Sequence, residues 1–221
     1  MAEVIGYGED ALTLSYLISP TKLSRLSNQL QRELVLPSPI TLGKGTTVTF
    51  YRPSFGRAQV GEPDFIIFAK TKDKQKGYWI VGESKWDHSD EIKGPARNRR
   101  ISLNHNQEIV RVNVLTRLLN VWAQHRGEGI EGYLEEITRA LGLQNPLRQG
   151  TVLFSILKDF FHRATEFYGD KIQVDMQALL VVFKPQGSGP IRFDPREGSR
   201  MICINSEYIN TDAYVPLDIR R

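Results

Sequence analysis

The spacing of apolar and polar residues predicts two helices at the start of the chain. The first is expected from about Gly8, with acidic residues in its first turn that suit the helix dipole, to Ser19-Pro20, where the proline disfavours continuation. The second has leucines at helical spacing: Leu23, Leu26, Leu30 and Leu34. Both helices are therefore expected to bury one apolar face.

Three β-strands are predicted next, at 46–52, 65–69 and 78–86, because these runs are rich in β-branched and aromatic residues. A polar turn at 70–77 joins the last two. The run 78–86, Y-W-I-V-G-E-S-K-W, begins with apolar residues on both faces. That pattern is typical of a central strand that is covered from both sides.

The second half of the chain predicts more helix and then strand. A long helix is expected over about 101–125, a short one over 133–141 that stops at Gly142, and another over 151–168. Strands are expected at 178–184 and 200–205. The inner stripe of the long helix is predicted to consist of Val110, Val114, Leu118 and Val121.

This order of elements predicts an α/β fold with a mixed central sheet flanked by helices. No linker rich in Pro, Gly or Ser separates two cores, so residues 1–221 are expected to form a single domain. Its core elements are placed within about 1–125, with helical and strand additions at 126–221.

Composition indicates the cellular location of the protein and the kind of partner that it binds. Cys203 is the only cysteine, which excludes a disulfide framework and favours a reducing, cytoplasmic location. No apolar run of about 18 residues predicts a membrane span, and the first residues do not resemble a signal peptide. A net charge of +4 and a pI of about 9.2 suit an anionic partner such as nucleic acid.

Glu83 and Lys85 stand out because they are two residues apart on a strand that is predicted to be buried, and therefore share a face. Buried charges need partners, so either the two form a structural ion pair or they line a cleft at the strand's end. Asp64 opens the preceding strand, in G-E-P-D-F-I-I-F, and antiparallel pairing would bring it close to Glu83. Two converging carboxylates beside a lysine suit a hard cation such as Mg²⁺.

Pro63-Asp64 followed by Glu83-Ser84-Lys85 resembles the motif of the PD-(D/E)xK nuclease superfamily, which has the restriction-endonuclease-like fold. The resemblance covers roughly residues 1–125 in the order α-β-β-β-α. It implies hydrolysis of DNA phosphodiester bonds with Mg²⁺ or Mn²⁺. Asp64 and Glu83 would then be metal ligands, and Lys85 the catalytic cation.

The same resemblance implies supporting positions. Many members carry an acid on the first helix, for which Glu9 is the candidate and Asp10 the competitor; either could instead serve the helix dipole. Some carry a glutamine on the helix after the motif, here Gln107 with Arg111 four residues on, although a core glutamine bonded to backbone is the alternative. Glu62 would support a second metal if the strand extended back that far.

The basic run 93–100, K-G-P-A-R-N-R-R, is predicted to contact phosphates of double-stranded DNA; alternatively it is a solvated loop. Its cations are Lys93, Arg97, Arg99 and Arg100. His88 and His105 bracket the run and are expected to be solvated or to cap loops.

The nuclease hypothesis leaves a role in restriction or defence and a role in repair both open. A homodimer is expected, because cutting both strands usually needs two active sites. The alternatives are a non-catalytic nucleic-acid-binding module on the same fold and a protein in which Glu83 and Lys85 are a structural pair. The sequence shows no zinc-ligand spacing, no G-x-S-x-G and no P-loop.

Overall fold

The computed structural model describes residues 4–33, 39–43, 46–55, 61–86, 105–189, 201–208 and 214–217. Its elements, in chain order, are β1 (Val4–Tyr7), α1 (Gly8–Ile18), α2 (Pro20–Glu33), β2 (Thr47–Tyr51), β3 (Phe65–Lys70), β4 (Lys76–Trp86), α3 (His105–Gln124), the short 3₁₀ helix η2 (Ile130–Tyr133), α4 (Leu134–Leu141), α5 (Val152–Tyr168), β5 (Gln173–Pro185), β6 (Met201–Tyr208) and β7 (Tyr214–Leu217).

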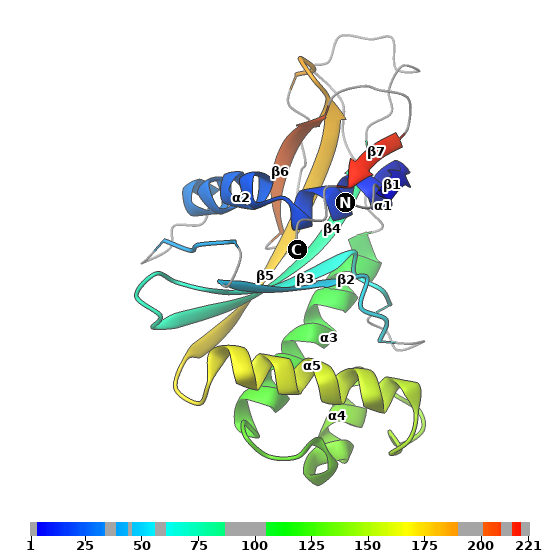
Figure 1. Ribbon diagram of the computed structural model, residues 1–221. Coiled ribbons are helices and arrows are strands. Elements are labelled where there is room, and N and C mark those ends of the chain that lie inside the picture. The colour runs from blue at the N-terminus through cyan, green and yellow to red at the C-terminus, as the bar shows by residue number, and fades with distance from the viewer. Residues whose placement is uncertain are drawn as a thin grey trace.

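A five-stranded sheet in the order β2-β3-β4-β5-β6 forms the centre of the molecule (Figure 1). The strands β2, β3 and β4 are antiparallel neighbours, whereas β5 runs parallel to both β4 and β6. The expected class, an α/β fold with a mixed sheet flanked by helices, is therefore confirmed. A two-stranded antiparallel pair of β1 and β7, which the sequence pattern did not predict, lies outside this sheet.

The second half of the chain supplies an inner strand of the sheet. β5 pairs with the whole length of β4, from Lys76 opposite Gln173 to Trp86 opposite Phe183. It begins at Gln173, earlier than the strand expected from residue 178. The boundary expected near residue 125 therefore does not coincide with an edge of the sheet.

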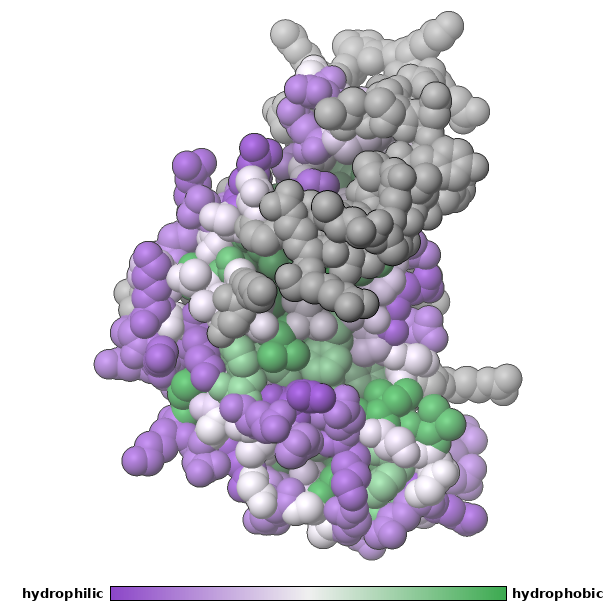
Figure 2. Space-filling view, in the orientation of Figure 1, coloured by the Kyte–Doolittle hydropathy of each residue, from purple (hydrophilic) through white to green (hydrophobic). Residues whose placement is uncertain are grey.

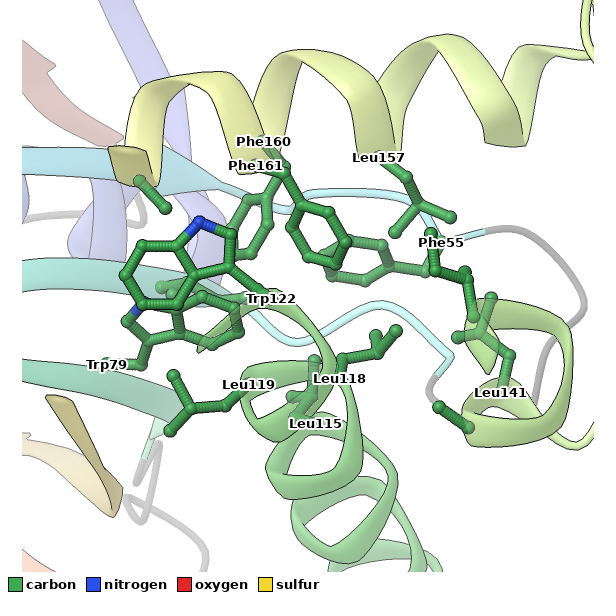
Figure 3. Packing of buried hydrophobic residues seen from close by; sticks show 14 of the residues in the cluster. Phe55, Trp79, Leu115, Leu118, Leu119, Trp122, Leu141, Leu157, Phe160 and Phe161 are labelled. Atoms are coloured by element: carbon green, nitrogen blue, oxygen red, sulfur yellow. The ribbon is translucent and has the colours of Figure 1, made fainter. Parts of the chain in front are cut away.

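One face of the sheet packs against α3, α4 and α5 through a core rich in aromatic rings (Figures 1 and 3). Trp79 of β4 contacts Phe160 of α5 edge-to-face, with ring centroids 4.9 Å apart, and stacks near Phe68 at 5.6 Å. Trp122 of α3 completes the cluster, 5.6 Å from Trp79. Interlocking rings of this kind leave little freedom for the helices to shift over the sheet.

The opposite face packs against α1 and α2. Leu26 and Leu30 are fully buried against it, as the leucine spacing predicts. On β4, Trp79 and Val81 face the first core while Tyr78 and Ile80 face the second. This confirms the prediction that the strand is covered from both sides.

The predicted inner stripe of α3 was partly wrong. Val114 and Leu118 are buried as expected, but Val110 is 40% exposed and Val121 is only partly buried. Among the described side chains of α3, those buried in the apolar core begin at Val114. Just before it Arg111 is paired with Glu83, so Val110 lies outside that core. The buried face is instead completed by Leu115, Leu119 and Trp122.

The end signals of two helices behave as their residue types predict. Gly142 ends α4 in the left-handed conformation, with φ of 65°, and its N–H donates to the carbonyl of Arg139. Thr151 caps α5, where its hydroxyl accepts a hydrogen bond from the N–H of Phe154. The outward surface over α5 is mainly hydrophilic (Figure 2). Within the described ranges, no helix combines the length and apolar character needed to cross a membrane.

Candidate active site

The β3–β4 hairpin brings the two predicted carboxylates to one end of the sheet. Phe65 is paired with Gly82, so one residue further along the same antiparallel register places Asp64 opposite Glu83. The pairing at this end depends on Gly82, because a Cβ there would lie only 1.8 Å from the ring of Phe65. The aromatic ring next to Asp64 thus occupies the space that a side chain at 82 would need.

Asp64 is held by Ser84. Its Oδ2 accepts hydrogen bonds from the backbone N–H of Ser84 at 2.7 Å and from the Ser84 hydroxyl at 2.9 Å. Ser84 is itself buried and lies 2.6 Å from the hydroxyl of Thr13 on α1. Burial, followed by the charge of Glu83, raises the pKa of Asp64 above its ordinary value, although the hydrogen bonds from Ser84 and the charge of Lys85 oppose the shift.

Glu83 and Lys85 do form a close pair, with 2.7 Å between Oε1 and Nζ. Glu83 has a second cationic partner, since Arg111 on α3 donates from its Nη1 to Oε2 at 2.7 Å. The side chains of Glu83 and Arg111 are only 14% and 15% exposed, whereas Lys85 is 34% exposed. Both oxygens of the Glu83 carboxylate are therefore held by cations.

Lys85 is a cation at neutral pH. Burial acts to lower its pKa, but the hydrogen bond and charge of Glu83 and the charges of Glu9 and Asp64 together raise it above the ordinary value. Its ammonium lies 3.8 Å from Oε1 of Glu9 as well. In this arrangement Lys85 can stabilise negative charge, and it is a poor proton acceptor.

The structure brings Glu9, rather than Asp10, to the end of β4. Oε2 of Glu9 accepts the backbone N–H of Trp86 at 2.7 Å, whereas Asp10 pairs with Arg52 at 2.9 Å. Gly8 precedes it with φ of +71°, a conformation that suits glycine, and lies against the ring of Trp86. Burial raises the pKa of Glu9, and the charges of Asp64 and Glu83 add to the shift, against Lys85 and the Trp86 N–H.

The remaining predicted residues lie elsewhere or outside the description. β3 does not extend back to Glu62, whose carboxylate is 3.7 Å from Arg52 and 47% exposed. Gln107 lies in the first turn of α3, but its side chain is outside the described part of the chain. The cations Lys93, Arg97, Arg99 and Arg100, and His88 with them, also lie outside the described residues.

The donor chemistry of the site fits a hard divalent cation. Glu9, Asp64 and Glu83 offer carboxylate oxygens of the type that Mg²⁺ prefers. Burial, with the like charges of the neighbouring carboxylates as a smaller cause, raises the pKa values of Glu9 and Asp64. Among the residues that the structure describes, however, no three acidic, histidine or cysteine side chains are arranged to hold a metal ion. Glu83 forms ion pairs with both Lys85 and Arg111, so a metal ion at Glu83 would have to replace at least one of these cations.

Sequence reasoning noted Arg111 only as a neighbour of Gln107 and missed its ion pair with Glu83. A signal was present, because Arg111 is three residues before the buried Val114 and therefore lies on the sheet side of α3. Thr13 was missed as well. It is four residues after Glu9 on α1, and its hydroxyl also contacts the carbonyl of Glu9 at 2.8 Å.

A hollow of about 570 Å³ lies away from these carboxylates, between η2 and α5. Its wall includes the apolar Ile130, Tyr133 and Phe161 and the charged Glu131 and Lys158, which pair at 2.7 Å. It contains none of the residues predicted for the nuclease site. Size alone does not make it the functional site, because the converging carboxylates are at the end of the β3–β4 hairpin.

The fold and this cluster define an α/β protein with a polar site of acidic and basic side chains at one end of its central sheet. Comparison of the chain with protein-family models, with curated proteins and with solved structures found no match in any of the three. The function is therefore argued from the residues of this chain.

Proposed function

We propose that this protein is a divalent-metal-dependent nuclease that hydrolyses phosphodiester bonds of double-stranded DNA. Asp64 and Glu83 would hold Mg²⁺ or Mn²⁺, Lys85 is the catalytic cation, and Glu9 is the supporting acid. The restriction-endonuclease-like character of the core belongs to the same proposal, as do a cytoplasmic location and a homodimer.

One observation supports the proposal above all others. The hairpin register places Asp64 opposite Glu83, and the alternation of β4 puts Lys85 on the same face as Glu83. A sheet needs no charges at this depth for its stability, and burying them is costly. Their gathering at one end of the sheet supports a site for a divalent cation, which could in turn bind an anionic substrate.

Each side chain has a definite task in this proposal. When bound, the divalent cation supplies charge stabilisation at the phosphate and an activated water. Lys85, which stays protonated, neutralises the negative charge that develops on the phosphate oxygens. Ser84 fixes the orientation of Asp64 through two hydrogen bonds, and the backbone of Trp86 does the same for Glu9.

The direct test is nicking of supercoiled plasmid in Mg²⁺ or Mn²⁺, compared with the same reaction in EDTA. Asp64→Asn and Glu83→Gln remove one charge each with little change of shape, and should lower cleavage by roughly 10³-fold, since metal stabilisation is worth several kcal/mol. Glu62→Gln is the matched control and should leave the rate unchanged. Cleavage by Asp64→Asn at the wild-type rate would refute the site.

The DNA partner is tested through the basic run. Replacing Arg97, Arg99 and Arg100 with alanine should weaken binding to all duplexes alike, measured by gel shift in Ca²⁺. The log-log salt slope of affinity should flatten by about 0.9 for each lost phosphate contact. An unchanged slope would mean that these cations are only solvated.

The non-catalytic nucleic-acid-binding module is retained as a second candidate because both oxygens of Glu83 are occupied by cations. A site that never accepts a metal would look like this. It predicts a gel shift without any nicking in Mg²⁺ or Mn²⁺. If Glu83 and Lys85 are only a structural ion pair, neither a gel shift nor nicking is expected.

A further inference from the structure

Arg111 occupies the position at which the proposed metal site should be open. Its guanidinium holds Oε2 of Glu83 at 2.7 Å, and both side chains are largely buried. The other acids of the site are held differently: Asp64 accepts bonds from the neutral N–H and hydroxyl of Ser84, and Glu9 accepts one from the Trp86 N–H. Glu83 is thus the acid most strongly neutralised by cations.

Because Lys85 has its own task at the phosphate in the proposed function, Arg111 is the cation of the cluster that would yield to a metal ion. With all groups ionised, three carboxylates and the two cations Lys85 and Arg111 leave a net charge of minus one. If Arg111 withdraws, the remaining net charge is minus two, which matches one divalent cation. A divalent cation beside Glu83 would otherwise lie next to a guanidinium, and the repulsion between them is strong at partly buried positions.

Arg111 also has a suitable alternative acceptor in the proposed substrate. A guanidinium presents the same planar fork to a carboxylate and to a phosphate, so it can exchange one for the other without changing its own geometry. Its Nη2 lies beside Gly61, 3.6 Å from where a Cβ would be, in the segment that leads to Asp64. The guanidinium therefore lies against the backbone of the segment that carries the proposed metal ligand Asp64.

We propose that Arg111 is a built-in counter-ion that competes with the divalent cation for Glu83 and transfers to a phosphate of the DNA when the site is loaded. The inference rests on the proposed nuclease function and adds a residue role to it. It accounts for the ion pair by which Arg111 holds one oxygen of a proposed metal ligand, Glu83. Arg111 thereby becomes a substrate-binding residue and a regulator of metal loading.

The first measurement is Mn²⁺ binding without DNA, followed by electron paramagnetic resonance or calorimetry. Arg111→Met should bind Mn²⁺ about tenfold more tightly than wild type, because one positive charge near the ion is gone. Arg163→Met removes the same charge from an exposed site on α5 and should leave the affinity unchanged. Equal or weaker binding by Arg111→Met would overturn the competition.

The second measurement is DNA affinity in Ca²⁺ across a salt series. Arg111→Met should bind duplex more weakly, with a slope flatter by about 0.9, while Arg163→Met should match wild type. Unchanged DNA affinity would overturn the transfer to phosphate. Arg111→Lys keeps the charge that Glu83 needs but lacks the fork, so it should fold and still lose DNA affinity; it provides the same test if Arg111→Met does not fold.

The two proposals fail in different ways. If wild type binds Mn²⁺ and cleaves DNA but Arg111→Met has the same Mn²⁺ affinity, only the role of Arg111 is wrong. If neither protein binds Mn²⁺ and wild type does not cleave, the metal site itself is wrong and this inference is wrong with it.

Discussion

The two halves of one face of β4 are opposite in character. Trp79 and Val81 are buried in the aromatic core beneath α3 and α5. On the same face, Glu83 instead forms ion pairs with Lys85 and with the guanidinium of Arg111. The helix that covers them changes in step, with Trp122 in its second half over the core and Arg111 in its first half over the charges. The difference is therefore made by side chains on a continuous scaffold, and stability and chemistry can be altered separately.

The largest effect on stability is expected in the apolar half. Trp79→Ala should lower the free energy of unfolding by about 3–5 kcal/mol, since it removes a fully buried ring that contacts the aromatic rings of Phe68, Trp122 and Phe160. Urea denaturation measures this directly. Val110→Ala, at the exposed position on α3, should change it by less than about 0.5 kcal/mol. A small loss for Trp79→Ala would mean that the core is not packed as described.

Lys85→Met should leave stability nearly unchanged and lower cleavage strongly. Glu83 keeps Arg111 as a partner and Lys85 is about one-third exposed, so stability should change by less than about 1 kcal/mol. Plasmid nicking should fall by roughly 10²–10³-fold, as for removal of one transition-state donor. A loss of about 3–5 kcal/mol that Mg²⁺ does not restore would identify a structural ion pair instead.

The contrast between these halves also explains what the sequence could predict. Apolar spacing predicted α2 and α5, end signals predicted α1, and residue composition with a polar turn predicted the β3–β4 hairpin. Each of these signals is visible in a short window of sequence. The motif at Asp64 and Glu83 was visible for the same reason. The contact between Arg111 and Glu83 depends on how α3 is rotated over the sheet. Local spacing did not establish that rotation, since two residues of the predicted inner stripe, Val110 and Val121, are not fully buried.

Strand pairing between distant parts of the chain was the other feature that the sequence did not predict. The start of β5 is polar and was not predicted as strand, because its residues 173–177 become strand through pairing with β4. β1 and β7 are short and meet only in the folded chain, so no local pattern indicates their pairing.

Asp64→Asn should stabilise the protein at neutral pH in the absence of divalent metal. The pKa of Asp64 is raised in the folded state, so the folded state holds its proton more tightly and becomes less stable as pH rises from about 3.9 through the raised pKa. The neutral amide can still accept the bonds from Ser84. Its melting temperature should exceed that of wild type at pH 7, with the gap closing near pH 4 and on adding Mg²⁺ to wild type. A lower melting temperature at pH 7 would contradict this.

The smallest effect is expected far from the site. His125 contacts Glu128 at 2.9 Å and Glu136 at 3.1 Å and stacks on Tyr133. The hydrogen bond with Glu128, and then Glu136, raises its pKa against the effect of burial. Its stabilisation is therefore complete below about pH 6.5 and lost as pH rises through the higher folded pKa.

His125→Gln should remove this pH dependence, a difference of about 1–3 °C in melting temperature between pH 6 and pH 9. His162→Gln, on the exposed face of α5, is the control and should retain it. An unchanged pH dependence in His125→Gln would assign the effect to other groups.

The position of β5 between β4 and β6 has a consequence for how the chain can be divided. A fragment that stops near residue 125 would contain Asp64, Glu83, Lys85 and Arg111, yet one side of β4 would be left with eleven residues unpaired. An apolar edge of that length is a template for pairing with other chains. Such a fragment should aggregate, so the residues of the candidate site are gathered in the first half of the chain but depend on the second half to stay folded.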